Sequence, residues 1–154
     1  MPIVSTKTLA PYTGNFLTKE LKHLLRRSLF GIDQNTLNYF KSMTMAQVID
    51  ELMIASTEPS PPLNNYQNQS PDPTVAYGQT WVNAPNEPTL NGERRNSFKS
   101  WLTMNQLHEN KSIVEKMALF LHCLLPIDID EVAAPRYAYS NYKMLRENSL
   151  GNFK

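Results

Sequence analysis

The sequence predicts an all-α protein with about six helices around a central helix. Apolar residues recur at spacings of three and four along most of the chain, which places them on one face of a helix. No segment alternates apolar and polar residues like a strand, and no internal repeat is visible. A chain of 154 residues is the usual size of one domain, so we expect a single helical unit over residues 1–154.

An irregular arm over residues 1–17 is expected to precede the first helix, because two prolines and a glycine interrupt it. The helix would have Thr18 as its N-cap and stop before Gly31. Its buried face would carry Leu21, Leu24 and Leu25.

Two shorter helices are expected before residue 56. Asp33 is placed to cap the second helix of the chain. Thr44 and Gln47 have the spacing of a capping box for the third, in which each side chain bonds to the backbone of the other residue. The third helix carries an apolar stripe, which we interpret as core rather than as a cofactor site. The stripe contains Met45, Val48, Ile49, Leu52 and Met53.

A long loop rich in proline and asparagine is expected over residues 56–92, between the third and fourth helices. It holds seven of the eleven prolines but few charges, and it contains Tyr66, Tyr77 and Trp81. Disordered linkers usually carry more charge and fewer aromatic residues. We therefore expect the aromatic side chains to anchor the loop to the helices. The alternative is a surface at Trp81 that binds a peptide or a glycan.

Three further helices are expected after the loop. The first resumes near Arg94, and the last begins with Pro135 in its first turn and ends at Gly151. Between them, Ser112 and Glu115 have the spacing of a capping box. The helix after this box is apolar on nearly every side, so it is expected to be the central, most buried helix. Its apolar residues include Phe120, Leu121, Leu124 and Leu125.

Charge and composition argue against several functional classes. The formal net charge of +1 at pH 7 is too small for a broad surface that binds nucleic acid or anionic membranes. No stretch approaches the roughly 20 apolar residues of a membrane span, and residues 1–17 lack the apolar segment of a signal peptide. A cytoplasmic protein is the default expectation. The single cysteine, Cys123, is expected to be inert in an apolar setting.

Common motifs for catalysis and ligand binding are absent from the sequence. It has no glycine-rich phosphate loop, no pair of cysteines or histidines at metal-binding spacing and no nucleophile elbow. The sequence therefore indicates no cofactor-binding residues and no metal site built on a known motif, and any cofactor is left unknown.

His122 is the strongest candidate for a functional residue. It follows Glu115 by seven residues, so both lie on one helical face two turns apart. A carboxylate and an imidazole in this arrangement can bind a metal ion or share a proton. The alternative is that His122 is a hydrogen-bonded core histidine and Glu115 only the acid of the capping box.

Three arginines could bind an anion. Arg26 and Arg27 belong to the first helix, and Arg146 to the last. Structural ion pairs with Glu115 or Glu147 are the favoured interpretation, because partly buried arginines normally have partners.

Four blocks of sequence carry a resemblance to a known family. The blocks are HLLRRSLFG at residues 23–31, GQTWVNAP at residues 78–85, EKMALFLH at residues 115–122, and LR with LGNF at residues 145–146 and 150–153. In these blocks the chain resembles the N-terminal part of the bacterial family called domain of unknown function 1800. The second block is similar to forms from the Bacteroidetes group.

The resemblance implies that this chain is the N-terminal part of a larger protein, because members of the family are generally much longer. The family's commonly exported, surface-associated character would then extend to that parent protein. The family commonly reads Trp-His-Asn-His-Phe where this chain has residues 121–125, so Leu124 replaces the second histidine. If the two histidines act together, this chain has lost half of the pair.

Two functional hypotheses of different classes follow. The first is a non-catalytic helical module that supplies packing or interaction surface to the remaining C-terminal part of a larger protein. The second is part of a hydrolase-like or metal-assisted enzyme, in which Glu115, His122 and Arg146 belong to a polar pocket that a missing C-terminal region completes. The setting of His122 discriminates between them: a concave polar surface favours the enzyme, and a sealed apolar setting favours the module.

Overall fold

The computed structural model describes residues 11–54, 57–68, 70–108 and 111–151, and within these ranges the protein is all-α, as the sequence predicts. The only β-type pairing in these ranges is one isolated antiparallel bridge between Leu63 and Thr80. These ranges contain six α-helices and one 3₁₀ turn. They are α1 (Thr18–Ser28), α2 (Gln34–Phe40), α3 (Met45–Leu52), η1 (Pro88–Leu90), α4 (Asn91–Leu107), α5 (Val114–Leu124) and α6 (Pro135–Glu147).

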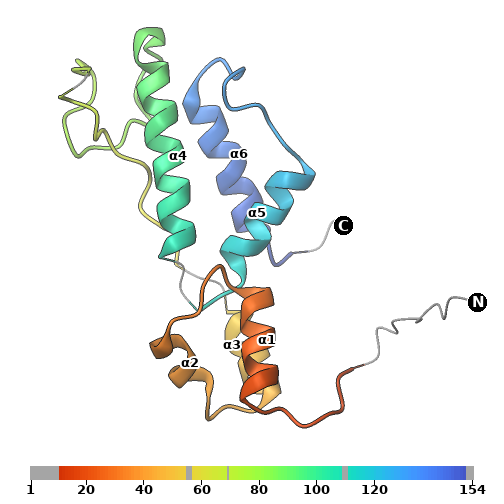
Figure 1. The fold of residues 1–154 in the computed structure, drawn as a ribbon. Coiled ribbons are helices and arrows are strands. Elements are labelled where there is room, and N and C mark those ends of the chain that lie inside the picture. The colour runs from red at the N-terminus through yellow and green to blue at the C-terminus, as the bar shows by residue number, and fades with distance from the viewer. Residues whose placement is uncertain (1–10, 55–56, 69, 109–110, 152–154) are drawn as a thin grey trace, which may run out of the picture.

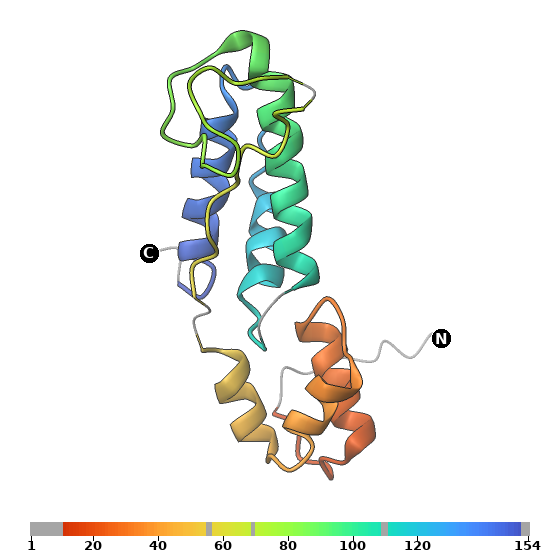
Figure 2. The same ribbon diagram turned by 90° about the vertical axis from the view of Figure 1, so that its left-hand side faces the viewer.

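The helices form two groups that stack end to end, with α1–α3 in one group and α4–α6 in the other (Figures 1 and 2). Each group has its own cluster of buried apolar residues. The cluster of the first group consists of Leu21, Leu25, Leu29, Leu37, Phe40, Val48 and Leu52. The cluster of the second group consists of Tyr66, Val75, Trp81, Phe98, Ala118, Ala138, Tyr139 and Tyr142. The second cluster includes residues of the long loop, which therefore belongs to the core of that group.

Local signals determine the helix ends in the first group. The Asp33 side chain accepts a hydrogen bond from the Thr36 N–H at 2.6 Å and caps α2 as the sequence predicts. Thr44 and Gln47 form the predicted capping box of α3. The N-cap of α1 is Leu17 rather than Thr18, which is the first helical residue.

The α5 helix is not the central, buried helix that its composition predicts. The residues that it buries are Val114, Glu115, Ala118 and Leu121. On the opposite side, Phe120 and Leu124 are 56% and 57% exposed. The three helices of this group all contact one another, and α6, which buries Tyr139 and Tyr142, makes the most extensive contacts. Among the described residues, this side of α5 stays exposed instead of packing on a neighbouring helix.

The capping box predicted at Ser112 and Glu115 does not form, because the N-cap of α5 is Ile113. The Ser112 hydroxyl instead donates to the carbonyl of Ile54 at 2.6 Å. The backbone N–H of Ile113 donates to the carbonyl of Leu52 at 2.9 Å. These hydrogen bonds join the end of α3 to the start of α5 and so connect the two groups.

Lys116 makes a second connection between the groups. Its ammonium donates to the carbonyl oxygens of Leu29 at 2.7 Å and Arg26 at 3.2 Å. Carbonyl groups at the C-terminal end of a helix lack partners within that helix and favour a positive charge. Lys116 of α5 therefore caps the end of α1 from the other group.

Phe98→Ala should lower the free energy of unfolding by about 3–5 kcal/mol, because it empties a fully buried site. The Phe98 ring contacts Trp101 and Tyr142, so the loss affects the centre of the second cluster. Urea unfolding followed by circular dichroism measures the change. Phe120→Ala on the exposed face of α5 is the matched control and should change stability by less than about 0.5 kcal/mol. An equal loss in the two variants would contradict the observed orientation of α5.

Candidate functional site

Two of the predicted site residues, Glu115 and Arg146, meet between α5 and α6. Arg146 Nε donates to Glu115 Oε1 at 2.6 Å, and the two residues are only 7% and 5% exposed. Arg146 Nη2 also donates to the backbone carbonyl of Thr57 at 3.0 Å. The Tyr142 hydroxyl donates to the second oxygen of Glu115 at 3.4 Å. The structural ion pair expected for Arg146 is therefore present, and its partner is Glu115.

The positions of the two charges explain why the pair forms here. Glu115 lies in the first turn of α5 and Arg146 in the last turn of α6, where each charge is favoured by its own helix dipole. Burial and the neighbouring Glu115 carboxylate raise the pKa of Tyr142 well above its usual value. Tyr142 therefore stays protonated and remains a hydrogen-bond donor.

His122 lies two turns beyond Glu115 on α5 and is half-buried. Its ring packs edge to face on Tyr142, with 5.8 Å between the ring centroids. Its Nδ1 atom is buried and has no hydrogen-bond partner in the described part of the chain. Tyr142 therefore links the two: its ring contacts the His122 ring, and its hydroxyl donates a hydrogen bond to Glu115 of the Glu115–Arg146 pair.

One small cavity borders the Glu115–Arg146 pair in the described part of the chain. A cavity of about 10 Å³ next to Arg146 is lined by Glu58, Pro59, Trp101, Tyr139, Lys143, Arg146 and Glu147. Such a volume holds about one water molecule. Among the residues that the structure describes, no group of three or more His, Cys, Asp or Glu side chains could hold a metal ion.

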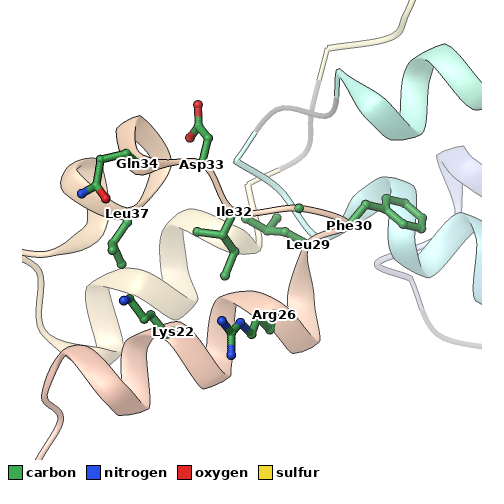
Figure 3. Close-up of a pocket in the computed structure, with 9 residues that line it drawn as sticks. Lys22, Arg26, Leu29, Phe30, Ile32, Asp33, Gln34 and Leu37 are labelled. Carbon is green, nitrogen blue, oxygen red and sulfur yellow. The ribbon is translucent and has the colours of Figure 1, made fainter.

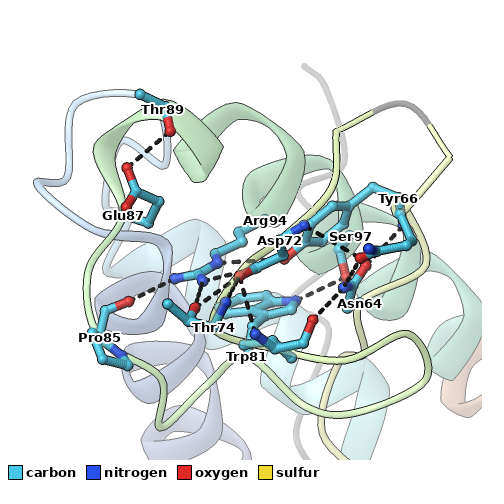
Figure 4. A network of polar contacts seen from close by, with 12 residues as sticks. Asn64, Tyr66, Asp72, Thr74, Trp81, Pro85, Glu87, Thr89, Arg94 and Ser97 are labelled. Atoms are coloured by element: carbon cyan, nitrogen blue, oxygen red, sulfur yellow. Dashed lines mark hydrogen bonds and ion pairs between the residues drawn. The ribbon is translucent and has the colours of Figure 1, made fainter.

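Trp81, the residue predicted as a loop anchor or a binding surface, is only 1% exposed. Its indole Nε1–H donates to the Ser97 hydroxyl of α4 at 3.0 Å, and Ser97 donates to the carbonyl of Leu63 at 2.7 Å (Figure 4). The ring therefore anchors the loop, and the exposed face that peptide or glycan binding requires is not present. Tyr77, also expected as an anchor, is instead 68% exposed.

A second buried ion pair, which the sequence analysis missed, attaches the loop to α4 (Figure 4). Arg94 Nη2 donates to Asp72 Oδ2 at 2.7 Å, and both side chains are almost completely buried. The Tyr66 hydroxyl donates to the same oxygen at 3.0 Å, and Arg94 Nη1 donates to the carbonyl of Pro85 at 2.9 Å. Asp72 is one of very few charged residues in the long loop, and this isolation could have predicted that its carboxylate has a specific partner.

The electrostatics of this network follow from burial and hydrogen bonding. Burial disfavours the ionised form of Asp72 and by itself would raise its pKa. Hydrogen bonds from Arg94, Thr74 and Tyr66 stabilise the carboxylate more strongly, so the pKa of Asp72 lies well below its usual value. Burial, together with the hydrogen bond to Asp72, raises the pKa of Tyr66 to about 12. At neutral pH the network therefore contains one carboxylate, one guanidinium and a protonated phenol.

The remaining predicted residues lie on the surface. Cys123 is exposed, so the apolar setting expected for its thiol is not present. Arg26 and Arg27 are exposed on α1, and in the described ranges neither forms an ion pair with Glu115 or Glu147.

The fold and these contacts define an all-α protein in which two of the charged candidate residues, Glu115 and Arg146, pair with each other inside the structure. The chain belongs to the family described as Protein of unknown function (DUF1800), whose model matches residues 23–154. No curated protein and no solved structure matches the chain significantly. Within the ranges that the structure describes, no helix has the length and apolar character needed to cross a membrane.

Glu115→Gln should lower the free energy of unfolding by about 3–5 kcal/mol, because it leaves the buried Arg146 guanidinium without a counter-charge. Glu58→Gln is the matched control, because Glu58 pairs with Lys143 on the surface. The control should cost less than about 1 kcal/mol. Thermal and urea unfolding of both variants would measure the difference, and similar small losses would contradict a buried ion pair.

Asp72→Asn should flatten the dependence of stability on acid pH. The pKa of Asp72 is depressed in the folded state, so its stabilising effect is present above its unfolded pKa of about 4 and is lost as the pH falls below it. The wild-type free energy of unfolding should therefore decline more steeply than that of the variant between about pH 5 and pH 2. Near neutral pH the variant should be the less stable of the two. Parallel pH profiles would contradict this role of Asp72.

Proposed function

We propose that this chain is a non-catalytic helical module that supplies packing and interaction surface to a larger protein of its family. The supporting observation is that Glu115 and Arg146 form an ion pair with each other. An enzyme site on these two helices would need both charged side chains to be free to contact a substrate. At 2.6 Å and almost no exposure, the carboxylate and the guanidinium neutralise each other inside the fold. Charged side chains that are paired in this way join α5 to α6 and do not contact a substrate.

The interaction surface that we propose is the outward stripe of α5. Met117, Phe120 and Leu124 follow one another at spacings of three and four residues, which places them on one helical face. The large exposed side chains at this end of α5 are Phe120, Leu124 and Leu125. The helix lies at the outer edge of its group (Figure 1). Single exposed apolar residues are ordinary, but a contiguous apolar stripe marks an interaction surface.

The occupant that we propose for this stripe is the remaining C-terminal part of the parent polypeptide. Phenylalanine and leucine without interspersed charge are typical of contacts that stay buried permanently. Lys116, the charged residue next to the stripe, donates its hydrogen bonds to α1 and does not interrupt the apolar face.

Hydrogen exchange measured on the complete reading frame and on residues 1–154 alone tests the proposal. The amides of residues 117–125 should exchange more slowly in the complete polypeptide, because a packed partner suppresses local opening. Phe120→Glu with Leu124→Glu should abolish that extra protection, whereas Tyr77→Glu, at an exposed aromatic residue of the loop, should not. Equal protection in both polypeptides would refute the proposal, as would a reading frame that encodes no further residues.

A contribution to a hydrolase-like or metal-assisted enzyme is the second candidate function. One observation favours it: the buried Nδ1 atom of His122 has no hydrogen-bond partner in the described residues, although buried polar atoms normally have one. A metal ion or a residue from another segment could occupy that position. Nitrogen-15 NMR of the imidazole during a Zn²⁺ titration tests this, with His23 and His108 as internal controls. A response of His122 at lower Zn²⁺ than the two controls supports this candidate, and equal or no response rejects it.

A further inference from the structure

A pocket between α1 and α2 lies apart from both buried polar networks (Figure 3). Its volume is about 370 Å³, which is the lower end of the range for small-molecule sites. Leu29 and Leu37 are buried and Ile32 is half-buried, so these three residues provide apolar walls. The exposed residues of the pocket are Lys22, Arg26, Phe30, Gly31, Asp33 and Gln34.

Two cationic side chains lie on the same side of this pocket. Lys22 and Arg26 are four residues apart on α1, and in Figure 3 the Lys22 side chain extends towards Leu37 while the Arg26 guanidinium lies below Ile32. In the described ranges neither side chain forms an ion pair or a hydrogen bond. Like charges at this spacing destabilise a helix slightly. A bound anion would remove that repulsion.

The single carboxylate of the pocket is directed elsewhere. Asp33 points away from Lys22 and Arg26 in Figure 3. Its carboxylate accepts the Thr36 N–H at 2.6 Å, and the hydrogen bonds to Thr36 lower the pKa of Asp33. Asp33 is therefore an ionised helix cap and does not neutralise the two cations.

The wall of the pocket next to the cations is held in place by the other helix group. Lys116 donates hydrogen bonds to the carbonyl groups of Arg26 and Leu29, directly before the segment that forms this wall. A β-carbon added at Gly31 would meet no atom within 4 Å, so the space beside the wall is open. The α1 side of the pocket is thus held in place before any ligand arrives, which reduces the entropic cost of binding.

We propose that this pocket binds a small organic anion. Its carboxylate or phosphate group would contact Lys22 and Arg26, because a guanidinium donates two parallel hydrogen bonds to either group. A small apolar body on the same ligand would pack on Leu29, Ile32 and Leu37. The site is independent of the α5 stripe, since the two surfaces belong to different helix groups (Figure 1).

Titrations of phenyl phosphate and of benzoate into the nitrogen-15-labelled chain test the proposal and distinguish the two anionic groups. Amide resonances of residues 29–34 should shift with at least one of them. Benzyl alcohol, which has the apolar body without the charge, and inorganic phosphate, which has the charge without the body, should each bind about tenfold more weakly. Shifts that spread over all basic surfaces, or the absence of shifts at residues 29–34, would overturn the proposal.

A charge-matched pair of variants then tests the two cations. Lys22→Gln with Arg26→Gln should weaken binding of the anion at least about tenfold, because it removes both charged donors. Lys19→Gln with Arg27→Gln removes the same charge from α1 at residues outside this pocket and should change binding less than about twofold. All four residues are exposed, and glutamine preserves helix propensity, so both variants should fold. Equal weakening in both variants, or none in the first, would refute the site.

Discussion

The ion pair between Glu115 and Arg146 is the interaction on which the arrangement of this protein most depends. It joins the first turn of α5 to the last turn of α6. Through Arg146 Nη2 it also holds the carbonyl of Thr57, at the beginning of the long loop. Three segments that are distant in sequence are therefore fixed by one guanidinium. Because the pair is almost completely buried, removing either partner would leave a charge without compensation in a medium of low dielectric constant.

The Asp72–Arg94 pair has the same role for the long loop. Loops of this length are normally solvated, since their backbone groups need hydrogen-bond partners. Here the loop supplies partners from its own side chains and from α4, and Trp81 then fills the core beneath it. A buried pair does not necessarily stabilise a fold more than apolar residues would. What it supplies in this protein is a defined path for a segment that has no regular secondary structure.

The two helix groups present different chemistry. The second group exposes an apolar stripe on α5, and the first exposes a cationic pocket between α1 and α2. The polar residues between the groups, Ser112 and Lys116, bind backbone carbonyl groups of α1 and of the end of α3. The protein thus uses its buried charges for internal cohesion, while the apolar stripe and the cationic pocket face outward.

Sequence alone determined the class of fold and the positions of all six helices to within a few residues. It also determined the caps at Asp33 and Thr44 and the loop between α3 and α4. These features depend on periodicity and on contacts between residues three or four apart, which a linear pattern records. The sequence also paired Arg146 with Glu115 as one of its alternatives, because an arginine in an amphipathic helix needs a partner.

Only the tertiary structure decided which side of α5 is buried. It also decided that the Ser112 hydroxyl donates to the carbonyl of Ile54 instead of forming a capping box. It also decided that Asp72 meets Arg94, which is 22 residues away, and that Lys22 and Arg26 border a pocket. An apolar helix has the same composition whether it has neighbours on one side or on all sides. A charge in a loop has many possible partners, and packing between distant segments selects one of them. The physical reason is that these outcomes depend on which segments are adjacent in space, and neither propensity nor spacing records that.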